Sequence, residues 1–158
     1  MRPGLPTPLT AAHDTSAFTC RHDSLSIWLN KRALANTASG ASRTYVVCAD
    51  DRRVVGYYAL AAGSIAGDAT PGRLSRNMRD PLPVIVLGRL AVHGDCLGRG
   101  IGSGLLKDAV LRSIRAAELI GVRALLCHAI DGEAKAFYLK HGFIESPLDP
   151  LTVLIGLR

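Results

Sequence analysis

Glycine recurs at every second position of one short segment, at residues 98, 100, 102 and 104. Such a segment leaves its backbone N–H groups uncovered, and a helix that begins there adds its own free N–H groups and the positive end of its dipole. Because exposed N–H groups of this kind bind anions, we expect the segment to hold a pyrophosphate. A short glycine pattern is weak evidence by itself, so a glycine-rich turn without a ligand is the alternative.

Two common nucleotide-binding motifs do not match this segment. A Walker loop requires Gly-Lys-Ser or Gly-Lys-Thr after four variable residues, and Lys107 is misplaced for that role. A Rossmann loop requires the spacing G-x-G-x-x-G within a βαβ unit, whereas the strands predicted before the glycines form an antiparallel hairpin. Both motifs are therefore disfavoured.

A tyrosine near the end of a predicted helix, Tyr138, is a second candidate for chemistry. Its hydroxyl has an ordinary pKa of about 10, so it is protonated at neutral pH and can donate a hydrogen bond or a proton. Packing beside Phe137 and Phe143 is the alternative reading of the same side chain.

Cysteine and histidine are neighbours at Cys127-His128 and close together at His93 and Cys96. Nucleophilic catalysis requires spatial pairing, which proximity in sequence does not supply, so we do not expect a Cys–His nucleophile. No spacing of these residue types fits a metal site, and we expect no metal.

The predicted elements place the glycine segment between a strand and a helix. Residues 83–92 form a nearly continuous apolar run, typical of a strand buried on both faces. Apolar residues at helical spacing from 105 onward predict a helix that ends near Gly121. The other predicted elements are a helix over 23–36 capped by Asp23, with Trp28 in the core, a hairpin of 44–48 with 54–62, a polar loop over 63–83, a strand over 122–130, a helix over 133–141 and a strand over 151–157.

Length and composition indicate one domain. The chain has 158 residues, and we expect residues 1–17, which hold three prolines, to be a partly ordered lead-in to a single domain over 18–158. No apolar run approaches the roughly 20 residues of a membrane helix and no secretory signal is recognisable, so we expect a cytoplasmic location without membrane contact. The net charge of +6 favours a polyanionic ligand.

The segment Leu97-Gly98-Arg99-Gly100-Ile101-Gly102 resembles the acyl-CoA loop of GNAT acetyltransferases, Gln/Arg-x-x-Gly-x-Gly/Ala, with Leu97 in place of the usual Gln or Arg. Residues 90–92 match the GNAT strand whose backbone pairs with the pantetheine arm. The resemblance implies an α/β (α+β) GNAT fold: a single mixed, mostly antiparallel sheet, splayed at the acetyl-CoA site and flanked by helices. It implies acetyl-CoA as co-substrate, bound by Leu90, Ala91, Val92, Leu97, Gly98, Arg99, Gly100, Ile101, Gly102 and Ser103.

Further blocks, at residues 40–47, 54–64, 84–92, 133–143 and 146–150, resemble the GNAT toxins of bacterial toxin–antitoxin pairs, the TacT and AtaT type. This resemblance implies acetylation of the α-amino group of aminoacyl-tRNA, a block of translation, neutralisation by a ribbon-helix-helix antitoxin, and a homodimer. It also implies that Tyr138 is the general acid toward the CoA sulfur. The candidates for tRNA phosphate contacts are Lys31, Arg32, Arg43, Arg73, Arg76 and Arg79, for which a solvated basic surface is the alternative.

Two other functions remain open on the sequence. The first is a GNAT enzyme that acetylates a small-molecule amine or a protein N-terminus. The second is a non-catalytic module that binds RNA or an antitoxin.

Overall fold

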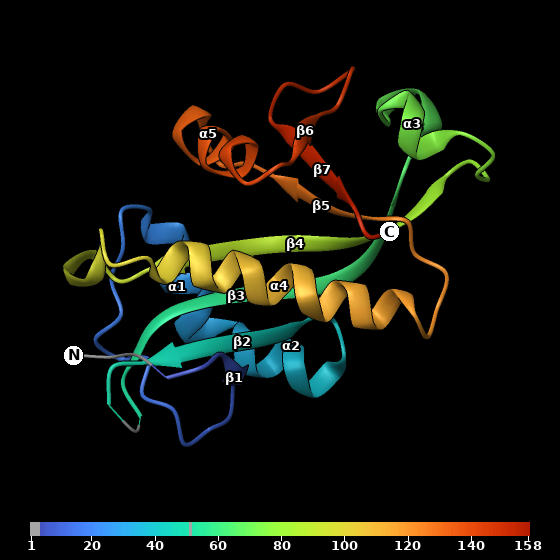
Figure 1. The fold of residues 1–158 in the computed structure, drawn as a ribbon. Helices are drawn as coiled ribbons and strands as arrows, with labels where there is room; N and C mark the ends of the chain where they lie inside the picture. The colour runs from blue at the N-terminus through green and yellow to red at the C-terminus, as the bar shows by residue number, and fades with distance from the viewer. Residues whose placement is uncertain (1–3, 51) are drawn as a thin grey trace. The chain divides into compact units, whose positions relative to one another are not determined.

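The computed structural model describes residues 4–50 and 52–158. Its strands form a mixed sheet in the order β1-β2-β3-β4-β5-β7-β6 (Figure 1). The strands are β1 (Thr7–Pro8), β2 (Arg43–Cys48), β3 (Val54–Ile65), β4 (Leu82–Val92), β5 (Ala124–His128), β6 (Ile144–Glu145) and β7 (Thr152–Gly156). The helices are α1 (Asp23–Lys31), α2 (Ala33–Ser39), α3 (Gly72–Ser75), α4 (Ile101–Ala117) and α5 (Gly132–Lys140), with 3-10 turns η1 (Gly67–Ala69) and η2 (Gly94–Cys96). The α+β class and the mixed sheet are confirmed.

The chain divides into two units. The first unit consists of Met1–Ala61 with Gly88–Ala109, and the second of Ala62–Leu87 with Val110–Arg158. The glycine segment belongs to the first unit and Tyr138 to the second.

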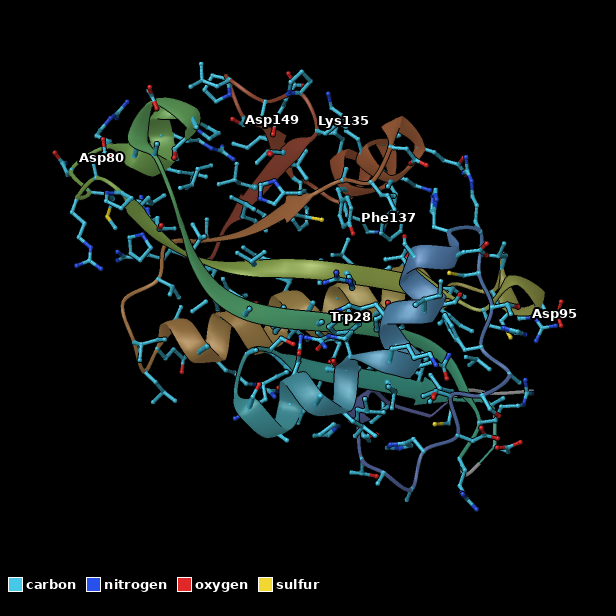
Figure 2. The ribbon with its side chains drawn as sticks, turned by 180° about the vertical axis from the view of Figure 1, so that it is seen from behind. Trp28, Asp80, Asp95, Lys135, Phe137 and Asp149 are labelled. Atoms are coloured by element: carbon cyan, nitrogen blue, oxygen red, sulfur yellow. The ribbon has the colours of Figure 1, made fainter. Side chains whose placement is uncertain are left out.

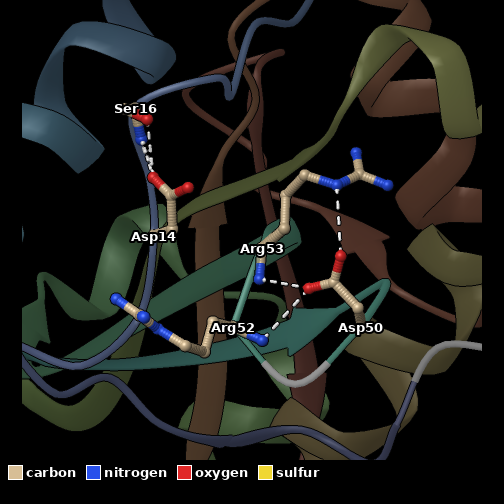
Figure 3. Close-up of polar contacts among 5 residues, drawn as sticks. All are labelled: Asp14, Ser16, Asp50, Arg52 and Arg53. Atoms are coloured by element: carbon tan, nitrogen blue, oxygen red, sulfur yellow. Dashed lines mark hydrogen bonds and ion pairs between the residues drawn. The ribbon is translucent and has the colours of Figure 1, made fainter.

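The predicted hairpin forms the centre of the first unit. Strands β2 and β3 pair antiparallel from Arg43↔Leu60 onward. Beyond the end of β2, the Asp50 carboxylate accepts hydrogen bonds from the backbone N–H groups of Arg52 and Arg53 at 3.2 and 2.9 Å (Figure 3). These bonds, that from Arg53 first, hold the pKa of Asp50 below its ordinary value. Local polar contacts therefore hold Arg52 and Arg53, just before β3, against Asp50.

In the first unit, α1 and α2 cover one face of the hairpin and the N-terminal half of α4 covers the other (Figures 1 and 2). Trp28 and Ala33 pack with Tyr57 in the core of the unit, which confirms the predicted place of Trp28. On the opposite face, a Cβ at Gly56 would lie 3.0 Å from a methyl group of Leu105 and 3.1 Å from one of Ile101. A residue without a side chain therefore lets α4 pack closely on β3.

The helix predicted over 23–36 is two helices. The backbone leaves helical geometry at Arg32, with φ −125° and ψ −27°, so α1 ends at Lys31 and α2 begins at Ala33. Asp23 is the first helical residue and not the cap, because the capping position belongs to His22. The acidic side chain still suits the first turn, where the helix dipole is positive.

The second unit is built around β5, which pairs in parallel with β4 from Val84↔Ala124 to Leu87↔Cys127 and antiparallel with β7. Leu74 of α3 packs in the core of this unit together with residues of β4, β5 and β7. The predicted loop over 63–83 is wrong in part, because it contains the end of β3, η1, α3 and the start of β4.

Two short strands were not predicted. Strand β1 pairs with β2 through Thr7↔Val46 and Pro8↔Tyr45, and β6 pairs with β7. Each has two residues, too few to show an alternating pattern in sequence.

Candidate active site

The loop part of the glycine segment is shorter than predicted, because α4 already begins at Ile101. Gly98 and Gly100 have φ of 77° and 78°, left-handed values that favour glycine, and open space surrounds the position of a Cβ at each. Gly102 and Gly104 lie within α4, and the Gly104 N–H donates to the Gly100 carbonyl at 3.0 Å. The prediction of four uncovered glycines is therefore wrong at Gly104, whose N–H the helix uses, whereas Gly102 lies in the first turn, where N–H groups have no partner within the helix.

The loop is anchored at its start by His93, which is buried. The His93 N–H donates to the Val55 carbonyl at 2.8 Å, and its ring Nδ1 accepts from the Thr19 N–H at 3.1 Å. The Gly94 N–H donates back to the Thr19 carbonyl at 2.9 Å. These bonds attach the segment that precedes the glycines to β3 and to the chain before α1, so the loop starts from a fixed point.

The other predicted cofactor residues differ in exposure. Leu97 is 64% exposed and Arg99 is also exposed, whereas the Ile101 side chain is buried against the Gly56 backbone. Leu90 and Val92 are partly buried on β4 and Ala91 between them is in the core. For Ile101 and Ala91 only the backbone is available to a ligand. Ser103 is exposed in the first turn of α4.

Tyr138 lies on α5, is 5% exposed and is hydrogen-bonded to the Cys127 thiol of β5. Its ring contacts those of Phe137 and Phe143 at centroid distances of 5.4 Å, so the predicted packing role and a polar contact coexist. Burial first, and then the nearby sulfur, raise the pKa of Tyr138 well above its ordinary value. Burial raises the pKa of Cys127 to about 11, against a lowering effect of the hydrogen bond from Tyr138. The second unit thus holds a protonated phenol against a sulfur atom.

His128 pairs with threonine and not with Cys127. The ring Nδ1 of His128 lies 2.8 Å from the Thr152 hydroxyl, which in turn donates to the Asp149 carboxylate at 2.7 Å. Alternation along β5 explains the difference, because Cys127 is buried and His128 is exposed on the other face. The Thr152 hydroxyl, together with the Leu151 N–H, lowers the pKa of Asp149. Sequence reasoning missed this network and the contact between Cys127 and Tyr138.

The predicted tRNA-binding side chains are all exposed, and they fall into two groups. The first unit holds Lys31 and Arg32 at the end of α1, and Arg43, whose guanidinium donates to the Thr37 carbonyl at 2.7 Å. The second unit holds Arg73, Arg76 and Arg79 in and after α3. Arg79 lines a groove of about 840 Å³ together with Met78, Arg123 and Arg158.

Within residues 4–50 and 52–158, no group of three or more His, Cys, Asp or Glu side chains could hold a metal ion. In the same ranges, no helix is long and apolar enough to cross a membrane.

The sequence is similar to those of known proteins. A model described as the acetyltransferase (GNAT) domain matches residues 41–145. A tRNA-acetylating toxin of Mycobacterium tuberculosis (strain ATCC 25618 / H37Rv) is 51% identical over 153 residues, which cover 97% of this chain and 92% of the relative. A probable toxin TacT of Sinorhizobium fredii (strain NBRC 101917 / NGR234) is 28% identical over 92% of this chain and 86% of its own length.

Solved structures agree on the fold. AtaT complexed with acetyl-methionyl-tRNAfMet superposes with a TM-score of 0.90 at 24% identity, covering 98% of this chain and 95% of that chain. AtaTR bound with AcCoA superposes with a TM-score of 0.83 at 25% identity, covering 96% of this chain and 92% of that chain.

The family model defines the class, an acetyltransferase of GNAT fold. The chain belongs to this family and, by its identity to the mycobacterial protein, to the tRNA-acetylating toxins within it. The predicted fold and enzyme class are confirmed, and the alternative of a non-catalytic module no longer applies.

Proposed function

We propose that this enzyme transfers the acetyl group of acetyl-CoA to the α-amino group of an amino acid esterified to tRNA, and that this blocks translation. The observation that carries the proposal is the identity of 51%, over almost the whole chain, to a tRNA-acetylating toxin.

The loop geometry fits acetyl-CoA, which supplies an activated acetyl thioester. Gly98 and Gly100 adopt left-handed φ in an exposed loop next to the start of α4, an arrangement typical of a backbone cradle for phosphate. The partly buried strand residues Leu90 and Val92 would offer backbone groups to the amide-rich arm. The proposed contacts are Leu90, Ala91, Val92, Leu97, Gly98, Arg99, Gly100, Ile101, Gly102 and Ser103.

Tyr138 would act as the general acid toward the leaving sulfur. A phenol is ordinarily a weaker acid than a thiol, whose pKa is about 8.5, so proton transfer to a thiolate requires the thiol to become the weaker acid. Cys127 supplies an internal measure of this effect, since burial beside Tyr138 raises its pKa to about 11. A CoA sulfur desolvated to a similar degree would hold a proton more tightly, which offsets part of the rise that burial causes in the pKa of Tyr138 itself. Tyr138 would therefore donate a hydrogen bond that becomes proton transfer as the C–S bond breaks.

The amine would require no strong base. A free α-amino group has a pKa of about 7.7–8.0, and a neighbouring ester lowers it, so a neutral fraction is present at pH 7. A backbone N–H near Leu90 would stabilise the oxyanion that forms at the thioester carbonyl. Catalysis would then rest on orientation, the backbone donor and Tyr138.

Basic side chains would hold the tRNA. The net charge of +6 favours a polyanion, and the six candidates Lys31, Arg32, Arg43, Arg73, Arg76 and Arg79 are all exposed. Phosphate contacts of this kind give affinity and position, not sequence preference.

The experiment that tests this proposal follows labelled acetyl from acetyl-CoA into a pool of aminoacylated tRNAs. Deacylated tRNA and aminoacyl-tRNA whose α-amine is already blocked are the matched controls. We expect label only on the free amine of charged tRNA. If the enzyme binds acetyl-CoA but labels only small amines or protein N-termini, the acceptor is wrong and those substrates replace it.

We further propose that the enzyme acts in the cytoplasm as a homodimer and is neutralised by a ribbon-helix-helix antitoxin. The resemblance of the sequence blocks to toxin–antitoxin enzymes supports these points. Light scattering tests the dimer, and co-expression with the product of an adjacent reading frame, scored by rescue of growth, tests the antitoxin.

A further inference from the structure

The first unit contains a half-buried cation without a counter-charge. Arg89 lies on β4 between Gly88 and Leu90, and its guanidinium carbon is 4.4 Å from the centroid of the Trp28 ring. In the parts of the chain that the structure describes, no carboxylate forms an ion pair with Arg89. Partial burial of a charge is costly unless an opposite charge or several hydrogen bonds compensate it. The ring face supplies only part of that compensation.

The platform beneath Arg89 is rigid. Trp28 is 9% exposed and stacks on Tyr57 with an interplanar angle of 12° and a centroid distance of 5.9 Å. The Tyr57 hydroxyl donates to the Leu25 carbonyl at 2.7 Å, in the same helix as Trp28. A guanidinium over an aromatic face is attracted by the π-electrons and still has N–H donors available to an anion. Trp28 therefore holds the Arg89 side chain in place before any ligand arrives.

The position of Arg89 on the strand puts it on the face that carries the core of the first unit. Side chains alternate along β4, and Ala91 packs in the same core as Trp28, so Arg89 and Ala91 share the face toward α1. By the same alternation, Gly88 and Leu90 lie on the opposite face. Arg89 is only partly buried, so part of its side chain is accessible to an anion from solvent.

We propose that Arg89, held over the Trp28 ring, binds a phosphate group of the aminoacyl-tRNA. This inference rests on the proposed function. The phosphates of acetyl-CoA are assigned to the glycine loop, a pantetheine arm away from the thioester near Leu90. The carboxylate of the amino acid is esterified in the acceptor, so the RNA phosphates are the anions that remain. The planar donor fork of arginine matches two phosphate oxygens, an arrangement that lysine cannot reproduce.

The test uses Arg89→Gln and Arg89→Lys in the full-length chain, with Arg115→Gln as the matched control. Arg115 is an exposed arginine in the last turn of α4, so its replacement removes the same charge from the surface. Dissociation constants for acetyl-CoA and for aminoacyl-tRNA are measured separately, each at several salt concentrations. Circular dichroism and the melting temperature confirm that every variant is folded.

We expect Arg89→Gln to weaken the binding of aminoacyl-tRNA by about tenfold or more, as for loss of a charge-assisted hydrogen bond. Arg89→Lys restores only part of the affinity. The slope of log affinity against log salt falls by about one unit in Arg89→Gln, because one phosphate contact is lost. Acetyl-CoA binding stays within the change seen for Arg115→Gln, and weakened acetyl-CoA binding alone contradicts the proposal.

The proposal is overturned if the dissociation constant of a folded Arg89→Gln variant for aminoacyl-tRNA stays within the change seen for Arg115→Gln. Its failure differs from failure of the proposed function. A wild-type enzyme that binds no charged tRNA removes the tRNA acceptor, whereas a wild-type enzyme that binds charged tRNA no more tightly than its Arg89→Gln variant removes only the role of Arg89.

Discussion

Each unit buries a tyrosine, and the two tyrosines differ in the partner of the hydroxyl. Tyr57 in the first unit is fully buried and donates to a backbone carbonyl, that of Leu25. Tyr138 in the second unit is nearly as buried but is bonded to the Cys127 thiol. Burial raises the pKa of both hydroxyls. Burial and pKa therefore do not separate a structural tyrosine from a catalytic candidate, whereas the partner does: a carbonyl fixes a proton in place, and a thiol is a weak and replaceable acceptor.

The largest expected effect that follows from this contrast is on the rate. Tyr138→Phe should lower the rate of acetyl transfer by about 10²–10⁴-fold, the usual contribution of a general acid. Its unfolding free energy should change by only about 1 kcal/mol, because a weak hydrogen bond is lost. Single-turnover transfer and urea denaturation measure the two quantities. A variant that unfolds easily but transfers acetyl normally once folded would make Tyr138 structural, like Tyr57.

The next largest effect is a loss of unfolding free energy at alkaline pH, caused by Cys127, the partner of Tyr138. Cys127 keeps its proton in the folded state up to a pKa of about 11, against 9.0 as the ordinary value. Between these values the unfolded chain has lost a proton that the folded chain retains, so stability falls as pH rises from 9 to 11. The shift of two units corresponds to at most about 3 kcal/mol.

Urea denaturation between pH 8 and 11 measures this loss for the wild type and for Cys127→Ala. Cys96→Ala is the control, because Cys96 is also buried but lies in the first unit. The decline should be shallower in Cys127→Ala and unchanged in Cys96→Ala. Equal slopes in all three proteins would remove Cys127 as the cause.

The smallest expected effect concerns Tyr57. Tyr57→Phe keeps the ring beneath Trp28 but leaves the Leu25 carbonyl without its donor, so the unfolding free energy should fall by about 2 kcal/mol. The rate per folded molecule should stay within about twofold of the wild type, since no proton transfer is assigned to it. A large loss of rate in a folded Tyr57→Phe protein would contradict the division between the two tyrosines.

Much of the fold could be predicted from the sequence because its signals are local. The apolar run over 83–92 and the β-rich runs of the hairpin gave β4, β2 and β3 nearly at their true bounds. The break at Arg32 could not be predicted, since no glycine or proline marks it and helical spacing continues through it. The end of the glycine loop was misplaced because glycines suggest a loop even where the chain is already helical.

The candidate site was predictable only where one short segment carries it. The left-handed glycines and Tyr138 could be named from sequence and resemblance. The pairing of Tyr138 with Cys127 depends on how α5 packs on β5, which residue spacing does not specify. Arg89 left a signal that could have been used, because it is the charged residue inside an apolar strand and such a residue requires a partner.

Gly56 links the shape of the proposed cofactor loop to a distant part of the sequence. The missing side chain at Gly56 sets how close Ile101 and Leu105 can come to β3, and Ile101 is the residue that directly follows Gly100. A single added methyl group on β3 would lift the first turn of α4 and tilt the loop attached to it. Grafting the glycine motif alone into another protein would therefore copy its backbone angles. It would not copy the distance of the loop from the sheet, because that distance is set by Gly56 in the hairpin.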